Sequence, residues 1–211
     1  MRKSLRTRLR AARRRLSPHQ QRLACAALSR RLHRDPSFRR ARHIAFYLAN
    51  DGEIDLLPLI RRQPTNKTFY LPLLSEAQRP WEATRLLFQA WNPSDKPLTK
   101  NRYGIFEPTY EPRKLRAASM LDMVLLPLVG FDRQGNRLGM GKGYYDRTFA
   151  RRAGHWRQPK LLGVAHACQE VPNLPHATWD VPLDGVITNK EIIWCLPRSA
   201  SAKNRELDLL R

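Results

Sequence analysis

The first part of the chain has a helical pattern of apolar residues. Four of them recur at spacings of four, three and four, which places them on one face of a helix: Leu5, Leu9, Ala12 and Leu16. Ser17-Pro18 is typical of a helix start, because the serine can cap the helix and the proline suits its first turn. A second helix is therefore expected from Pro18 to about His33, and Asp35-Pro36 should end it.

Beyond residue 42, short apolar runs alternate with helical patterns. Strands are expected at His43–Ala49, Thr68–Leu74, Thr84–Trp91, Met120–Phe131, Lys160–His166 and Asp184–Thr188. Helices are expected at Ile54–Arg62 and from about Gly143, whereas residues 92–116, rich in proline and charge, should be mostly loop. This alternation predicts an α/β fold with three layers: a mainly parallel sheet, helices on both of its faces, and an N-terminal basic helical pair.

Length and composition favour one globular unit. The chain has 211 residues, of which 42% are hydrophobic, so it can bury a core and is not a disordered chain. No run approaches the ~20 apolar residues that a membrane helix needs. We expect a single domain over residues 1–196, with the two helices inside residues 1–34, and a frayed polar tail at 197–211.

The charge is strongly basic and unevenly distributed. The formal net charge is +21, and residues 1–42 contribute +14 of it, from 15 Lys and Arg and a single acid. Such an excess suits phosphate backbones, so an RNA- or ribosome-binding protein is one hypothesis. An arginine-rich start also fits an organelle transit peptide, but only Ser4 and Ser17 supply the serines that such a peptide needs.

The cysteines and histidines give no sign of a disulfide framework or a zinc site. Cys25, Cys168 and Cys195 are odd in number and widely spaced, which favours a reducing compartment and hence the cytoplasm. No pair of His, Cys or Asp has zinc-site spacing. Cys168 and His166 would share one face of a strand, but we expect no catalytic role for this pair. Cys25 is expected to be a small core residue.

The strongest chemical signal is Arg137–Arg147, RLGMGKGYYDR, which follows a buried strand and opens a helix. Alternating glycines let backbone N–H groups approach an anion closely, and here they are Gly139, Gly141 and Gly143. The helix start, Lys142 and Arg137 add positive charge. The run predicts a phosphate cradle, with a plain glycine-rich connection as the alternative. Its spacing fits neither a P-loop nor a dinucleotide fingerprint.

The longer run from Gly135 to Arg147 resembles the signature of the 5-formyltetrahydrofolate cyclo-ligase family. Other segments agree in order and spacing: Lys3–Arg6 with Arg13–Ser17, Phe46–Asp55 and Trp179–Thr188. The resemblance covers about residues 3–194. It implies ATP- and magnesium-dependent closure of 5-formyltetrahydrofolate to 5,10-methenyltetrahydrofolate, with ADP and phosphate released, through a phosphorylated formyl group. Fold alone would allow other chemistry, such as sugar-phosphate isomerisation, but this specific run argues against it.

The resemblance also implies roles for individual residues. Lys142 and Arg137 would be catalytic. The ATP-binding residues would be Lys3, Arg6, Arg137, Gly139, Gly141, Lys142, Gly143 and Tyr145. The folate-binding residues would be Leu48, Glu53, Met140 and Tyr144. Mg²⁺ would be bound by Asp146 and Asp180, with Asp184 competing for the second position.

Several of these residues have a structural alternative. Glu53 suits a pterin because a carboxylate accepts two N–H bonds, but it could simply be an acid at a helix start. Asp180 could be a turn residue before Pro182, and Tyr144 or Tyr145 could pack in the core. The expected partners are folate and ATP, with nucleic acid at most an additional partner. We expect a monomer that does not associate with membranes.

Overall fold

The computed structural model describes most of the chain. The described residues are 1–62, 66–74, 85–95, 98–150 and 158–195. The tail expected to be frayed, residues 197–211, lies outside them, as does Thr84 at the start of one predicted strand. Within the described part, no helix is long and apolar enough to cross a membrane.

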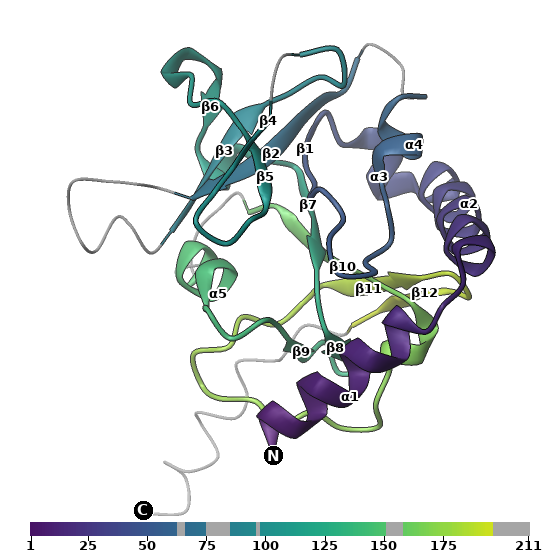
Figure 1. Ribbon diagram of the computed structural model, residues 1–211. Coiled ribbons are helices and arrows are strands. Elements are labelled where there is room, and N and C mark those ends of the chain that lie inside the picture. The colour runs from purple at the N-terminus through teal and green to yellow at the C-terminus, as the bar shows by residue number, and fades with distance from the viewer. Residues whose placement is uncertain (63–65, 75–84, 96–97, 151–157, 196–211) are drawn as a thin grey trace, which may run out of the picture.

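An eight-stranded sheet forms the centre of the molecule, in the order β12-β11-β10-β7-β1-β2-β3-β6 (Figure 1). Its strands are β1 His43–Ala45, β2 Thr68–Leu74, β3 Leu86–Ala90, β6 Leu115–Arg116, β7 Met123–Pro127, β10 Lys160–Ala165, β11 Gly185–Thr188 and β12 Ile192–Trp194. The five strands from β11 to β2 pair in parallel, and β12, β3 and β6 join by antiparallel pairing. The predicted mainly parallel sheet is confirmed.

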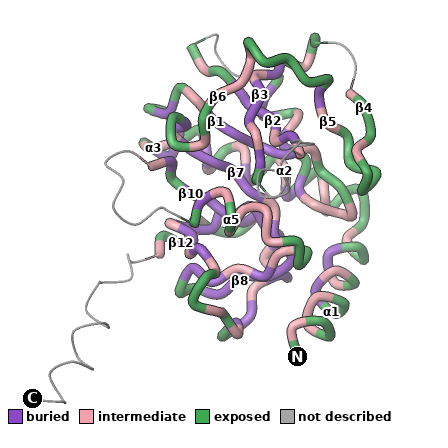
Figure 2. The backbone as a smooth tube through the Cα atoms, turned by 90° about the vertical axis from the view of Figure 1, so that its left-hand side faces the viewer, coloured by how far each residue is buried: buried purple, intermediate pink, exposed green. Residues whose placement is uncertain are grey.

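Helices cover both faces of this sheet. On one face lie α2 (Pro18–Arg34), α3 (Pro36–Arg40) and α4 (Leu57–Ile60), and on the other lies α5 (Tyr144–Phe149) (Figure 1). Figure 2 shows that buried positions run through the sheet strands. The three predicted layers are therefore present.

The first two helices pack in different places. Helix α1 (Arg2–Arg14) lies against the short hairpin of β8 (Gly130–Phe131) and β9 (Arg137–Leu138), and against a 3₁₀ turn at Ala167–Gln169. Its Leu9 packs so closely on Gly130 that a Cβ there would lie 2.4 Å from the Leu9 Cδ1. Glycine at this position lets α1 approach the carboxyl end of the sheet.

Two predicted elements are shorter than expected. The strand predicted at His43–Ala49 ends at Ala45, and residues 46–50 lead without regular secondary structure into a turn at Asp51 and Gly52. The helix predicted at Ile54–Arg62 is only α4, because Pro58 lacks an N–H and fits only the first turn of a helix.

Two other segments contain more breaks or more structure than expected. The strand predicted at Met120–Phe131 is divided into β7 and β8, because Gln169 Nε2 binds the carbonyls of Leu128 and Val129 between them. Residues 92–116, expected to be mostly loop, include β6 and a hairpin of β4 (Leu98–Lys100) and β5 (Phe106–Pro108).

Candidate active site

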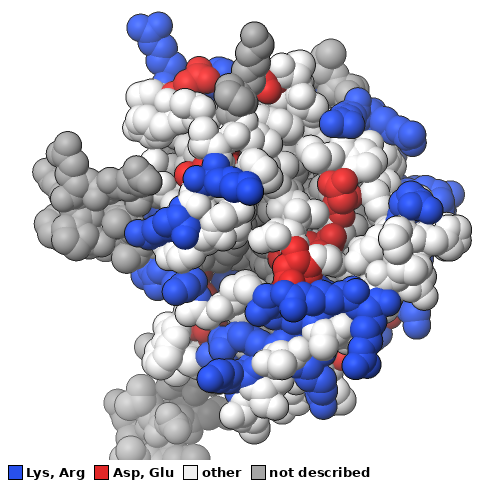
Figure 3. Space-filling model, viewed as in Figure 1, with Lys and Arg blue, Asp and Glu red and all other residues white. Residues whose placement is uncertain are grey.

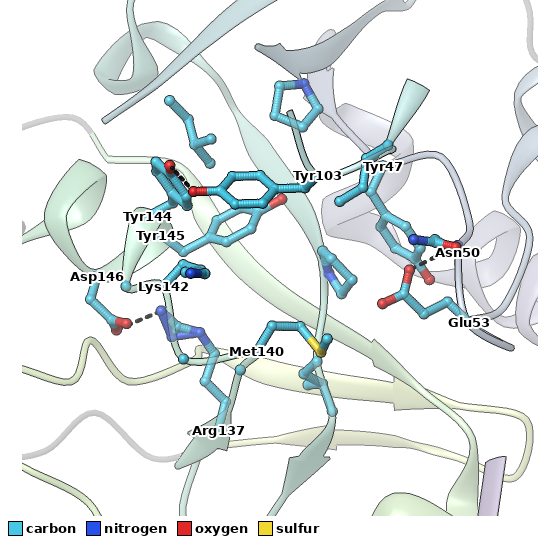
Figure 4. A pocket seen from close by; sticks show the side chains of 18 of the residues that line it. Tyr47, Asn50, Glu53, Tyr103, Arg137, Met140, Lys142, Tyr144, Tyr145 and Asp146 are labelled. Carbon is cyan, nitrogen blue, oxygen red and sulfur yellow. Dashed lines mark hydrogen bonds and ion pairs between the residues drawn. The ribbon is translucent and has the colours of Figure 1, made fainter. Parts of the chain in front are cut away.

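A cavity of about 820 Å³ lies at the carboxyl end of the parallel strands. Open α/β sheets bind ligands at this edge, and the volume suits a small molecule. The walls come from α1, the turn after β1, the hairpin of β4 and β5, the glycine loop before α5, and the segment before β11. Figure 4 shows Glu53 at one end of the cavity and Asp146 at the other, with Met140 between them.

The glycine loop joins β9 to α5 and contacts α1. Gly141 has φ +95° and Gly143 has φ +67°, a backbone region that favours glycine. Arg6 Nε donates a 2.8 Å hydrogen bond to the carbonyl of Gly139, and a Cβ on Gly141 would lie 3.4 Å from the Arg6 guanidinium. Two of the three glycines are therefore required by backbone conformation. The loop curves around the guanidinium of Arg6, which lies on α1.

A buried arginine orients the first predicted magnesium ligand. Arg137 Nη2 donates to Asp146 Oδ1 at 2.6 Å, and Nη1 donates to the Val181 carbonyl at 3.2 Å. The Val181 N–H donates to the same Asp146 oxygen at 3.1 Å. Burial lowers the pKa of Arg137 and Asp146 opposes this, so the guanidinium stays charged at neutral pH.

Asp180, and not Asp184, lines the cavity. The Asp180 carboxylate accepts hydrogen bonds from the Arg2 guanidinium and from the Ala177 N–H at 2.8 Å. Asp184 instead binds the backbone of Leu161, with its Oδ2 accepting the Leu161 N–H at 2.7 Å. Asp184 therefore fastens the start of β11 to β10.

Glu53 lies at the opposite end of the cavity and is mostly buried, with 13% of its side chain exposed. Its Oε2 accepts the Asn50 N–H at 3.1 Å, and its Oε1 lies 3.5 Å from Arg13 Nη2. Burial raises the pKa of Glu53 to about 7, with Asp51 acting in the same direction and Arg13 opposing it. This carboxyl therefore changes charge near neutral pH.

Asp51 fastens the turn after β1 to α1. Its carboxylate pairs with Arg10 Nε at 2.7 Å, with Arg13 Nη2 at 2.8 Å and with Arg14. Burial opposes ionisation, but these hydrogen bonds outweigh it and lower the pKa of Asp51 to about 2. The ring of His166 supports the same turn, since its Nε2 lies 3.2 Å from the Gly52 carbonyl.

Aromatic and apolar side chains form the rim. Tyr144 OH accepts a hydrogen bond from Arg102 Nη2 at 2.8 Å and lies 3.1 Å from Tyr103 OH. Lys142 Nζ lies 5.4 Å from the centre of the Tyr103 ring. Large apolar side chains are also exposed around the opening, among them Phe106, Met140 and Trp179. Exposed apolar surface around a cavity is typical of a ligand site.

A sequence model described as the 5-formyltetrahydrofolate cyclo-ligase family matches residues 1–189. The chain belongs to this family. A relative named 5-formyltetrahydrofolate cyclo-ligase, from Escherichia coli K12, is 39% identical over 185 residues, which are 87% of this chain and 98% of the relative. A protein of the same name from Haemophilus influenzae is 38% identical over 189 residues, 88% and 96% of the two chains.

Solved structures agree with this assignment. The NMR structure of the 5,10-methenyltetrahydrofolate synthetase of Aquifex aeolicus matches with a TM-score of 0.75 and 28% identity, covering 94% of this chain and 97% of that one. A synthetase of Mycoplasma pneumoniae matches in fold, with a TM-score of 0.62 and 22% identity. The fold of this chain is that of the cyclo-ligases.

Most of the site residues expected from the cyclo-ligase resemblance line the cavity at the carboxyl end of the sheet. Of those expected to bind ATP or Mg²⁺, the lining includes Arg6, Arg137, Gly139, Gly141, Lys142, Gly143 and Tyr145, with Asp146 and Asp180. Of those expected to bind folate, it includes Leu48, Glu53, Met140 and Tyr144. Tyr144 and Tyr145 also pack against the core, which confirms the structural alternative, while their binding roles stay predictions.

Lys3 is exposed and is not among the residues that line the cavity. The face of α1 that meets the cavity carries Arg2, Arg6, Arg10 and Arg13. Their spacing of four, four and three places them on one face of a helix. This spacing could have predicted Arg2, Arg10 and Arg13 as site residues, but the helix was predicted from its apolar positions alone. Tyr103 carries no comparable signal, because the hairpin that presents it was expected to be loop.

Proposed function

We propose that this protein closes the ring of 5-formyltetrahydrofolate to give 5,10-methenyltetrahydrofolate, using ATP and Mg²⁺ and releasing ADP and phosphate. Family membership supports the overall reaction. The observation that carries the finer proposal is one cavity with a glycine-rich, positively charged loop at one end and a buried carboxylate at the other.

The phosphate end would hold ATP. The amides of the glycine loop, the start of α5 and the charges of Arg2, Arg6 and Lys142 suit a triphosphate. Phosphoryl transfer needs positioning and charge neutralisation more than covalent help from the protein. The loop and α1 supply both, because they are held together by the bond from Arg6 to Gly139.

The folate end would hold the pterin. An ionised Glu53 can accept two N–H bonds from the amino-pyrimidine edge of the ring, a geometry that a carboxylate matches well. Leu48 and Met140 offer apolar contact to the ring, and the exposed aromatic rim suits the rest of the molecule.

The proposed reaction needs no covalent bond between the protein and either substrate. The formyl oxygen takes the γ-phosphoryl group of ATP, which releases ADP and turns that oxygen into part of a leaving group. The N10 nitrogen then attacks the formyl carbon and loses its proton, and the carbon–oxygen bond breaks to release phosphate. The protein's part is to align the formyl oxygen with the γ-phosphoryl group and to exclude water.

The chain's own residues fit Mg²⁺. This ion takes one or two carboxylates and completes its shell with water and phosphate oxygens. Asp146 and Asp180 both line the phosphate end. The described residues contain no group of three or more His, Cys, Asp or Glu that could hold a metal ion. When bound, the ion would neutralise charge on the phosphates.

A direct assay tests the proposal. Purified protein is mixed with 5-formyltetrahydrofolate, ATP and Mg²⁺, and the long-wavelength absorbance of the methenyl product is followed. Product should form only in the complete mixture, and each single omission is the control. A complete mixture that yields no product beyond the ATP-free control would contradict the proposal.

A further inference from the structure

The guanidinium of Arg13 lies where three parts of the site meet, and its side chain has no exposed surface. Its Nε donates to the Asp51 carbonyl at 2.8 Å, and its Nη1 donates to the Leu128 carbonyl at 3.1 Å. Its Nη2 binds the Asp51 carboxylate at 2.8 Å and lies 3.5 Å from Glu53 Oε1. One side chain of α1 thus contacts the turn after β1 and the end of β7.

These contacts fix the guanidinium in one orientation. The three nitrogens of arginine form a planar fork, and here each of them has an acceptor in a different direction. Two of the acceptors are backbone carbonyls, which cannot follow a moving side chain. The nitrogen that faces Glu53 is therefore held in place by contacts other than Glu53 itself.

We propose that Arg13 is a positioning residue for the folate substrate, acting through Glu53. It sets the place of the Glu53 carboxylate, and its positive charge favours the ionised form that accepts the two N–H groups of the pterin. The inference rests on the proposed role of Glu53.

The charge that Glu53 must carry explains why it needs a positively charged neighbour such as Arg13. A protonated carboxyl would present an O–H toward a ring edge that also donates, so only the ionised form accepts two N–H bonds. Burial raises the pKa of Glu53 to about 7 and Arg13 opposes this. The other groups that face Glu53 are Asp51, which favours the neutral form, Arg10, which favours the charged form, and the hydroxyls of Tyr47 and Tyr145.

The test is a set of folate affinities measured by titration calorimetry without ATP, over a range of pH around neutrality. Arg13→Met should weaken binding about tenfold or more at neutral pH and move the midpoint of its pH dependence upward, because Glu53 is then protonated. Arg14→Met is the matched control. Arg14 pairs with Asp51 on the exposed side of α1, so this variant should bind folate like the wild type.

A double-mutant cycle tests whether Arg13 affects folate binding through Glu53. Glu53→Gln alone should weaken binding, and Arg13→Met should add little in the Glu53→Gln background. If Arg13→Met does not fold, as judged by circular dichroism, Arg13→Lys replaces it, because an ammonium keeps the charge but cannot reach all the acceptors. Arg13→Lys should shift the midpoint of the pH dependence of folate binding upward by less than the loss of the positive charge would.

Two results would overturn the inference while the wild type binds folate. One is an equal loss of affinity in the Arg13 and Arg14 variants. The other is an effect of the Arg13 variant that persists undiminished without the Glu53 carboxylate. A wild-type protein that binds no folate would instead contradict the proposed function.

Discussion

Arg137 lies at the start of β9 and Lys142 in the glycine loop that follows it, and the two side chains have different surroundings. Arg137 has 6% of its side chain exposed and forms an ion pair with Asp146, so it supports the structure as well as the site. Lys142 is exposed and contacts the face of the Tyr103 ring. The two positive charges can therefore be separated by mutation, because only the removal of Arg137 leaves a carboxylate without its ion-pair partner.

Lys142→Ala should lower kcat/KM by about 100-fold or more, the usual effect of losing one group that stabilises a transferring anion. Its thermal unfolding midpoint should stay close to that of the wild type, since no buried contact is lost. The absorbance assay and a thermal melt check both statements. Turnover equal to the wild type would show that the lysine is not part of the phosphate site.

Glu53→Gln should change stability in a pH-dependent way. The folded-state pKa of Glu53 lies near 7, above its usual 4.5, so ionisation destabilises the fold as the pH rises through this interval. Gln removes that cost, and the variant should be more stable than the wild type by up to about 3 kcal/mol at pH 8. The gain should vanish near pH 4.5. Urea unfolding at both pH values measures it, and an equal gain at both would refute the assignment.

At the scale of elements, α1 shows what the sequence could and could not predict. Its apolar spacing correctly predicted a helix with Leu9 inside, because periodicity reports which face is buried. The burial of Arg13 could not be predicted in this way, because its acceptor Asp51 lies 38 positions further along the chain. Hydrophobic patterns treat arginine as a solvent-facing residue, and only the tertiary fold supplies its partners.

Sequence motifs predicted one end of the site better than the other. The proposed phosphate loop is local, so its glycines and charges could be recognised in one run of residues. The proposed folate end is assembled from the turn after β1, from α1 and from the hairpin of β4 and β5. Its arrangement depends on which strands are neighbours, which local patterns do not specify.

Gly130→Ala tests how closely α1 must approach the sheet. The added Cβ would lie 2.4 Å from Leu9, so we expect the free energy of unfolding to fall by about 1–3 kcal/mol. ATP binding should weaken as well, because α1 carries Arg2 and Arg6. Leu9→Ala creates room, so the double variant should be less destabilised than the sum of the two single variants. Urea unfolding measures this, and simple additivity would contradict the proposed contact.

At the scale of the whole molecule, the basic excess has a structural role. Figure 3 shows Lys and Arg side chains gathered along α1, beside a hollow in which acidic side chains are visible. Arg10, Arg13 and Arg14 pair with Asp51, and Arg31 binds the carbonyl of Lys190. Several of the arginines that suggest nucleic acid thus form ion pairs or hydrogen bonds within the molecule, and Arg10 and Arg13 do so beside the cavity proposed for two anionic substrates.

The sheet explains how these distant segments share one cavity. Parallel strands bring their carboxyl ends to the same edge, so the turn after β1 and the segment after β7 meet there. Helix α1 closes this edge and contacts both ends of the cavity through Arg6 and Arg13. We propose that the two substrates react with each other inside this space.

Isotope transfer tests that claim most directly. The formyl oxygen of 5-formyltetrahydrofolate is labelled with ¹⁸O, and the released phosphate is analysed by mass spectrometry. If ATP phosphorylates the formyl oxygen in the cavity, each phosphate released should carry one labelled oxygen. Methenyl product accompanied by unlabelled phosphate would contradict the account.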